Sequence, residues 1–187
     1  MPDESFKVLG PIAIAIAVLT AWVLLKTWPQ GKHASISQHA GAQTKTFWVF
    51  MVVMTLDNLL LLVFIWKWFV PAIGLRPGFA AIFTLGFLLQ ATAALIPDRG
   101  DGSRASKNHA LAAFSMAGVM PLLTLWLALS PHVGTLPRLL SALGTAWMFF
   151  SFYLFLFVRR SRKHFLIFQT IFIATFYACI LATTYLR

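Results

Sequence analysis

Residues 47–66 of the chain read FWVFMVVMTLDNLLLLVFIW, a run that is apolar except near its centre. The hydrocarbon core of a bilayer is about 30 Å thick, and a helix that crosses it needs about 20 mainly apolar residues. The stretch therefore predicts a transmembrane helix. Asp57 and Asn58 stand side by side at its centre, where an acid is costly and commonly functional.

Five further windows of similar length surround this one. Hydrophobic residues make up 59% of the chain and charged residues 11%, and the mean hydropathy is +0.80, which excludes an ordinary soluble domain. A membrane β-barrel would instead show alternating segments of about 10 residues. We predict an all-α polytopic membrane protein, a bundle of six transmembrane helices that forms one domain over residues 1–187. The predicted spans are 8–26, 46–66, 72–96, 109–130, 137–158 and 164–186.

The first window is interpreted as a retained span and not as a signal peptide. Its leader, MPDESFK, is not basic, and no small-x-small cleavage site follows the apolar run. The connections between spans are short, so they cannot build an extramembrane domain. The single cysteine, Cys179, excludes an intramolecular disulfide.

The net charge of +10 is distributed unevenly between the two ends of the predicted bundle. Ten of the 15 basic residues fall in or beside the first, third and fifth connections: Lys26, Lys32, Lys45, Arg99, Arg104, Lys107, Arg159, Arg160, Arg162 and Lys163. Cytoplasmic loops carry an excess of Lys and Arg. We therefore expect the odd-numbered connections in the cytoplasm and both termini on the outer side.

The basic run RRSRKH, residues 159–164, is predicted to contact lipid headgroups. Basic residues at the cytoplasmic surface attract anionic phospholipid at about 1 kcal/mol each. We expect membrane lipids as partners and no nucleic acid, and leave a homo-oligomer or a membrane-protein partner open. The predicted headgroup residues are Arg159, Arg160, Arg162 and Lys163.

Asp57 has no Lys or Arg well inside any span to pair with, so it must be protonated or face a wet cavity. Counted inward at 1.5 Å per residue, other polar residues share the cytoplasmic half of the bilayer with it. They are Gln90, Ser115, Ser151, Tyr153, Gln169, Thr170 and Thr175. We predict a ligand-binding polar cavity around Asp57, open to the cytoplasmic side, with Asn58, Gln90 and Gln169. The alternative is a structural one, in which a protonated Asp57 ties two helices together for about 0.6 kcal/mol.

Histidines gather at the cytoplasmic interface: His33, His39, His109 and His164. Three of them could hold zinc with a carboxylate from Asp98 or Asp101, as in a catalytic site with an open position. The spacing shows neither H-x-x-x-H nor H-E-x-x-H, so we predict no metal at His39, His109 and His164 and no cofactor. Haem between His109 and His164 is not favoured either. If there is catalysis, its candidates are His39, Asp98 and His109.

The order of short motifs is more telling than any one residue. SISQHAG (35–41) precedes the second span, LGFLLQATAALIPD (85–98) ends the third, and NHALAAFSMAG (108–118) opens the fourth. This order resembles the six-span family of the FGF-receptor-activating protein and the autophagy modulator DRAM, with its bacterial relatives, over residues 30–187. The matching positions are Ser35, Ser37, Gly41, Pro97, Asp98 and His109.

The resemblance implies a six-helix bundle and roles around lipids, glycolipid-anchor remodelling or organelle membranes. It adds Ser35 and Ser37 to the predicted ligand-binding residues. For this chain we expect the bacterial inner (plasma) membrane. The chain departs from the pattern in having His39 and a basic loop where many members carry acidic residues or proline.

Three functions fit these patterns. The one we favour is an integral membrane protein that binds or organises lipid. The second is an intramembrane lipid hydrolase or transferase, metal-dependent or not, that uses His39, Asp98 and His109. The third is a small proton-coupled carrier built around Asp57, although the chain shows no internal repeat of the kind that many carriers have. Whether the protein is an enzyme is left open.

Overall fold

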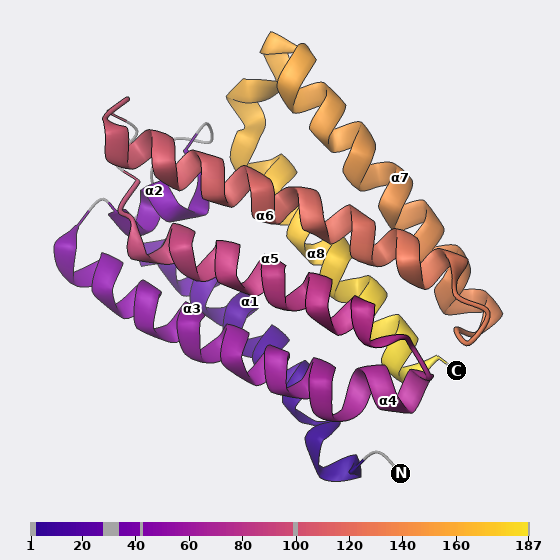
Figure 1. Ribbon diagram of the computed structural model, residues 1–187. Helices are drawn as coiled ribbons and strands as arrows, with labels where there is room; N and C mark the ends of the chain where they lie inside the picture. The colour runs from indigo at the N-terminus through magenta and orange to yellow at the C-terminus, as the bar shows by residue number, and fades with distance from the viewer. Residues whose placement is uncertain (1–2, 28–33, 42, 99–100, 187) are drawn as a thin grey trace.

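The computed structural model describes residues 3–27, 34–41, 43–98 and 101–186, without the side chains of Arg159, Ser161 and Arg162. All regular structure in these residues is helical (Figure 1). Six helices of the described chain are long and apolar enough to cross a membrane, which confirms the all-α six-helix bundle. The main helices are α1 (Leu9–Thr27), α3 (Thr44–Phe64), α5 (Pro77–Leu95), α6 (Arg104–Leu129), α7 (Thr135–Phe157) and α8 (Phe165–Tyr185).

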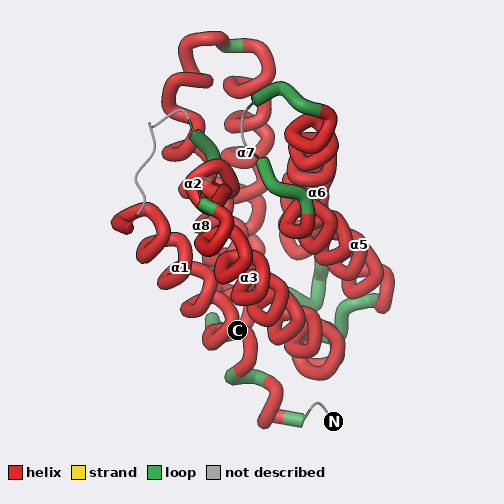
Figure 2. Tube along the Cα trace, turned by 90° about the vertical axis from the view of Figure 1, so that its left-hand side faces the viewer, coloured by secondary structure: helices red, strands yellow, loops and turns green. Residues whose placement is uncertain are grey.

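Both chain termini lie at one end of the bundle, which we call the terminal end (Figure 1). The opposite end holds the connections α1–α3, α5–α6 and α7–α8, and also the short helix α2 (Ile36–Gly41), so we call it the α2 end (Figure 2). Because the spans alternate in direction, helices adjacent in sequence pack side by side: α1 on α3, α5 on α6, α6 on α7 and α7 on α8.

The third span starts a few residues later than the predicted start near residue 72. Helix α3 continues through a π-helical turn, η2 (Ile65–Phe69), into α4 (Val70–Ile73). Gly74 then ends α4 with a φ of 74°, the left-handed conformation that suits glycine after a helix. Helix α5 begins only at Pro77, in a first-turn position where proline is favoured because its missing N–H is not needed. Residues 72–76 therefore belong to the end of α4 and the turn.

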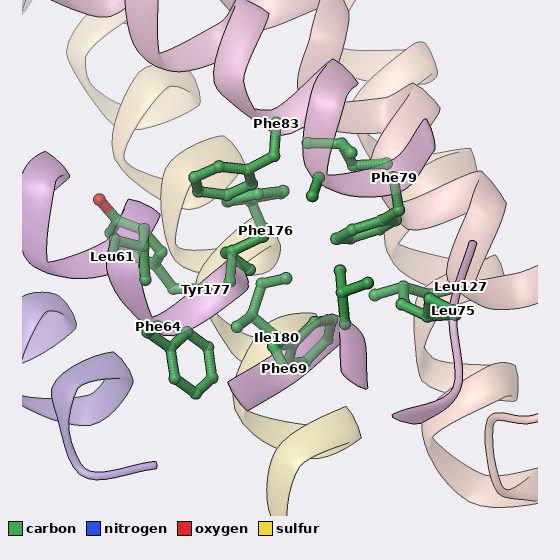
Figure 3. Close-up of a cluster of buried hydrophobic side chains, with 14 of the residues drawn as sticks. Leu61, Phe64, Phe69, Leu75, Phe79, Phe83, Leu127, Phe176, Tyr177 and Ile180 are labelled. Carbon is green, nitrogen blue, oxygen red and sulfur yellow. The ribbon is translucent and has the colours of Figure 1, made fainter. Parts of the chain in front are cut away.

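The dry core of the bundle lies toward the terminal end. Its members come from the first halves of α1 and α5, the second halves of α3 and α6, the η2–α4 segment, and α8 from Phe172 onward, with Met148 of α7 and the loop residues Leu75 and Val133. Figure 3 shows part of this cluster, including Phe64, Phe79, Phe83, Phe176 and Ile180. The rings of Phe83 and Phe176 stack with their centroids 6.4 Å apart, so the cluster joins α5 to α8.

The terminal end is closed by contacts between the N-terminal segment and the bundle. The short helix η1 (Glu4–Phe6) precedes α1, and the indole N–H of Trp68 donates to Glu4 Oε1 at 3.2 Å. The Lys7 ammonium lies 5.1 Å from the Trp68 ring and 5.2 Å from the Tyr185 ring, a cation–π arrangement. The opposite, α2 side of the bundle contains a pocket.

Candidate functional site

Helix α2 was not predicted, although the sequence contains its start signal. The backbone N–H of Ser35 donates to Gln38 Oε1 at 3.0 Å, and the backbone N–H of Gln38 donates to Ser35 Oγ at 3.1 Å. This reciprocal pair is a capping box, for which S-x-x-Q is the sequence signature. The hydroxyl oxygens of Ser35 and Ser37 are also 2.8 Å apart, so both serines of SISQHAG lie at the start of α2.

Besides packing on α1 and α3, α2 is held by a hydrogen bond and by a close backbone approach. The backbone N–H of Ile36 donates to Oε1 of Gln169 on α8 at 2.9 Å. At the other end of α2, a Cβ built on Gly41 would lie 2.6 Å from the carbonyl oxygen of Asp98, so only glycine allows the close approach to the chain after α5. Helix α2 therefore bridges α8 and the end of α5.

His39 and His109 both direct Nδ1 to backbone carbonyls. His39 Nδ1 lies 2.8 Å from the carbonyl oxygen of Ser35. His109 Nδ1 lies 2.9 Å from the carbonyl oxygen of Ala93 and 2.8 Å from that of Ile96. A carbonyl only accepts, so each Nδ1 carries the hydrogen and Nε2 is the acceptor of the neutral ring. His109 thereby satisfies the last turn of α5 from α6.

A pocket of about 740 Å³ lies between the helices on the α2 side of the core. Its volume falls within the range of about 300–1,000 Å³ that is usual for ligand pockets. Five of the predicted ligand-binding residues line it: Ser35, Ser37, Asn58, Gln90 and Gln169. Two of the catalytic candidates, Asp98 and His109, line it as well, whereas His39 is buried and is not among the lining residues.

Of the other polar residues predicted to lie at a similar depth, only some line the pocket. Ser151 and Thr170 line the pocket, whereas Ser115, Tyr153 and Thr175 are not among its lining residues. Gln38 and Tyr177 line it too, although neither was predicted. The capping signature could have pointed to Gln38, but no local pattern marks Tyr177.

The pocket reaches the surface of the bundle beside α1 and α8. Val18 and Trp22 of α1 line it and are 55% and 59% exposed. Thr170 and Ala174 of α8 line it and are exposed as well. Toward the core the lining is apolar and aromatic, as at Phe83.

Asp57 is not among the lining residues, and its neighbour Asn58 is. Asp57 is 0% exposed and lies on the buried stripe of α3 with Leu61 and Phe64, one and two turns farther along. Within the described part of the chain neither carboxyl oxygen has a hydrogen-bond partner. Tyr177 of α8 is near enough to interact with Asp57 electrostatically, and Figure 3 shows Tyr177 beside Leu61. Asn58 donates to the carbonyl oxygen of Met54 at 2.6 Å and faces the pocket.

No three or more His, Cys, Asp or Glu side chains converge as a metal site would, among the residues described. His164 is exposed at the end of the short helix η3 (Arg159–His164), and His33 lies outside the described residues. Of the predicted headgroup residues, Arg160 and Lys163 are exposed on η3 at the α2 end. The side chains of Arg159 and Arg162 lie outside the described part.

Comparison with known proteins gives no match to a family model, a curated sequence or a solved structure. Membership of the six-span family suggested by SISQHAG and the motifs after it therefore stays a prediction. The fold and the site identify an integral membrane protein with six candidate spans and a largely apolar pocket that carries polar side chains at its α2 end.

Proposed function

We propose that the protein binds a membrane lipid in the pocket at the α2 end, with that end facing the cytoplasm. The observation that carries the proposal is the polarity of the pocket. Ser35, Ser37, Gln38 and Gln169 lie at its α2 end, and the lining becomes apolar and aromatic toward the core. An amphipathic ligand with a polar head and an acyl chain matches this gradient.

The depth of the pocket also suits an acyl chain. Its lining on α8 runs from Phe165 to Tyr177, which is about 18 Å at 1.5 Å per residue. One leaflet contributes about half of the roughly 30 Å hydrocarbon core. The pocket therefore spans about the depth of a single leaflet.

The exposed lining residues support a ligand that comes from the bilayer. Val18 and Trp22 lie within α1, on a stretch that would face lipid, and they also line the pocket. Thr170 and Ala174 do the same on α8. A lateral opening between α1 and α8 would let a lipid enter without leaving the membrane.

Charge supports the proposed orientation. The connections at the α2 end are those that carry most of the basic residues, which favours the cytoplasmic side of a bacterial inner membrane. Exposed Arg160 and Lys163 would attract anionic phospholipid to this rim. In this proposal the rim concentrates lipid and the pocket binds one molecule of it.

Native mass spectrometry of the protein released from mild detergent tests the proposal. Ala117→Trp places a large side chain in the pocket, because Ala117 lines it. Leu122→Trp, on the same helix, is the matched control, because Leu122 is 50% exposed and does not line the pocket. We expect wild type and Leu122→Trp to retain lipid and Ala117→Trp to lose it. Equal lipid on all three proteins would refute a pocket site.

A second function, hydrolysis or transfer of a lipid acyl group, is favoured by one observation. His109 and Asp98 line the same pocket, and the Nδ1 bonds of His109 make Nε2 the basic nitrogen of its ring. Such a nitrogen can take a proton from water or a hydroxyl that attacks an ester. Release of fatty acid by wild type but not by His109→Gln would support it, and no release by wild type would exclude it for the esters supplied.

A further inference from the structure

Gln38 and Gln169 line the pocket, and the hydrogen bonds of their side-chain oxygens determine how both amides are oriented. Each side-chain oxygen accepts from a backbone N–H, that of Ser35 at 3.0 Å and that of Ile36 at 2.9 Å. A backbone N–H can only donate, so the atom bound to it must be the amide oxygen. The orientation of both amides is thereby determined, and Nε2 of each remains as a donor with two hydrogens. Among the described residues neither Nε2 has a hydrogen-bond partner.

The two side-chain amides lie at the same place, the start of α2. Their oxygens bind consecutive backbone N–H groups of the same chain segment, yet Gln38 comes from α2 and Gln169 from α8. Both residues line the pocket. The N–H groups of Ser35, Ile36 and Gln38 are already used by side-chain oxygens. The donors left for a ligand therefore include the two side-chain amides and one hydroxyl hydrogen of the Ser35–Ser37 pair.

The position and charge of these donors indicate which part of a lipid they meet. Gln169 is four residues into α8, about 6 Å below its start. The exposed cations Arg160 and Lys163 lie on η3, before that start. A phosphate therefore suits the basic rim, whereas neutral donors one helical turn deeper suit an uncharged acceptor next to the acyl chain.

We propose that Gln38 and Gln169 donate to the ester carbonyl oxygens of an acyl-ester lipid, with an acyl chain extending toward Phe83. The inference rests on the proposed lipid-binding function and specifies the ligand class. An ester carbonyl is an acceptor with two lone pairs, and it lies where the polar part of a glycerolipid meets its chains. The pocket thus distinguishes acyl-ester lipids from ether lipids, which lack the carbonyl.

Binding of a matched lipid pair tests the inference. Delipidated protein is titrated with diacyl and dialkyl phosphatidylglycerol of equal chain length, and bound lipid is measured by native mass spectrometry. The dialkyl lipid has no ester carbonyls to accept these hydrogen bonds. We therefore expect a preference of about three- to tenfold for the diacyl lipid. Ala117→Trp, which fills the pocket, defines the signal from lipid bound elsewhere.

Gln169→Glu removes the donors and keeps an oxygen for the Ile36 N–H, and Gln38→Glu does the same toward Ser35. At pH 8, above the ordinary glutamate pKa of about 4.3, an ionised carboxylate at either position accepts hydrogen bonds but cannot donate them. We expect the diacyl preference to fall in each, with the thermal midpoint unchanged. If Gln169→Glu fails to fold, Gln38→Glu decides the question.

The outcomes separate the two proposals. Equal binding of both lipids by wild type, abolished by Ala117→Trp, would overturn the ester inference and leave lipid binding in place. An unchanged diacyl preference in both glutamate variants would also overturn it. Failure of wild type to bind either lipid in the pocket would overturn the proposed function itself.

Discussion

Gln169 accepts a hydrogen bond from the backbone N–H of Ile36 at 2.9 Å, across 133 residues of sequence. The bond joins the last span to the segment between the first two. Because α2 also contacts the chain after α5 through Gly41 and Asp98, three segments that are distant in sequence meet at the α2 end of the pocket. The α2 end of the pocket therefore forms only when α8 has packed against the other helices.

Replacing Asp57 with leucine should stabilise the protein. Its carboxyl group is fully buried without a hydrogen-bond partner among the described residues, and leucine has the same branching. Removing an unsatisfied buried polar group is worth about 1–3 kcal/mol, less the cost of the larger side chain. We expect a higher free energy of unfolding in detergent, with lipid binding retained. A clear loss of stability would show that Asp57 has a partner or binds a ligand.

A methyl group at Gly41 should displace α2 at the α2 end of the pocket and lower stability. The added Cβ of Gly41→Ala would lie 2.6 Å from a backbone carbonyl oxygen, so α2 must shift, at about 1–3 kcal/mol. Gly118→Ala is the control, because Gly118 is inside α6 with nothing within 4 Å of an added Cβ. Alanine there should stabilise the helix by about 0.5–1 kcal/mol. Thermal unfolding of both variants in micelles measures the difference, and equal midpoints would contradict the contact.

His109→Ala should lower the free energy of unfolding by about 1–3 kcal/mol, because the carbonyls of Ala93 and Ile96 lose their donor. Exposed His132 provides a comparison, and His132→Ala should change stability by less than about 0.5 kcal/mol. Chemical unfolding of the two variants beside wild type checks the expectation. Similar small effects would mean that His109 has no structural role.

Asp101 should make stability depend on pH in the acid range. Hydrogen bonds from Ser103 and from the Ser106 hydroxyl hold the pKa of this exposed carboxyl at about 2, below its ordinary 3.8. Because the folded pKa is the lower one, the carboxylate stabilises the fold above about pH 4, and this contribution is lost as the pH falls to about 2. The thermal midpoint of wild type should therefore fall more over this window than that of Asp101→Asn. If the thermal midpoints of the two proteins fell equally with pH, the stabilising role of the Asp101 hydrogen bonds would be contradicted.

Much of the site's composition could be predicted from depth alone. Counting 1.5 Å per residue inward from the basic connections places Gln90 and Gln169 at similar levels, and both line the pocket. The same count includes Ser115 and Tyr153, which do not line it. The depth of a residue follows from its position along the helix, so the sequence gives it. Which side of the helix faces the pocket depends on the neighbouring helices, so the sequence does not give it.

The sequence by itself determined the six spans, because an apolar run of bilayer length is a local property. It also contained the start of α2, in the S-x-x-Q of SISQ. Only the tertiary structure decided which face of each span is buried. Asp57 and Asn58 point about 100° apart around α3, and one is enclosed while the other lines the pocket. In lipid the outward face of a span is as apolar as the inward face, so no pattern in the sequence distinguishes them, and the packing of neighbouring helices decides.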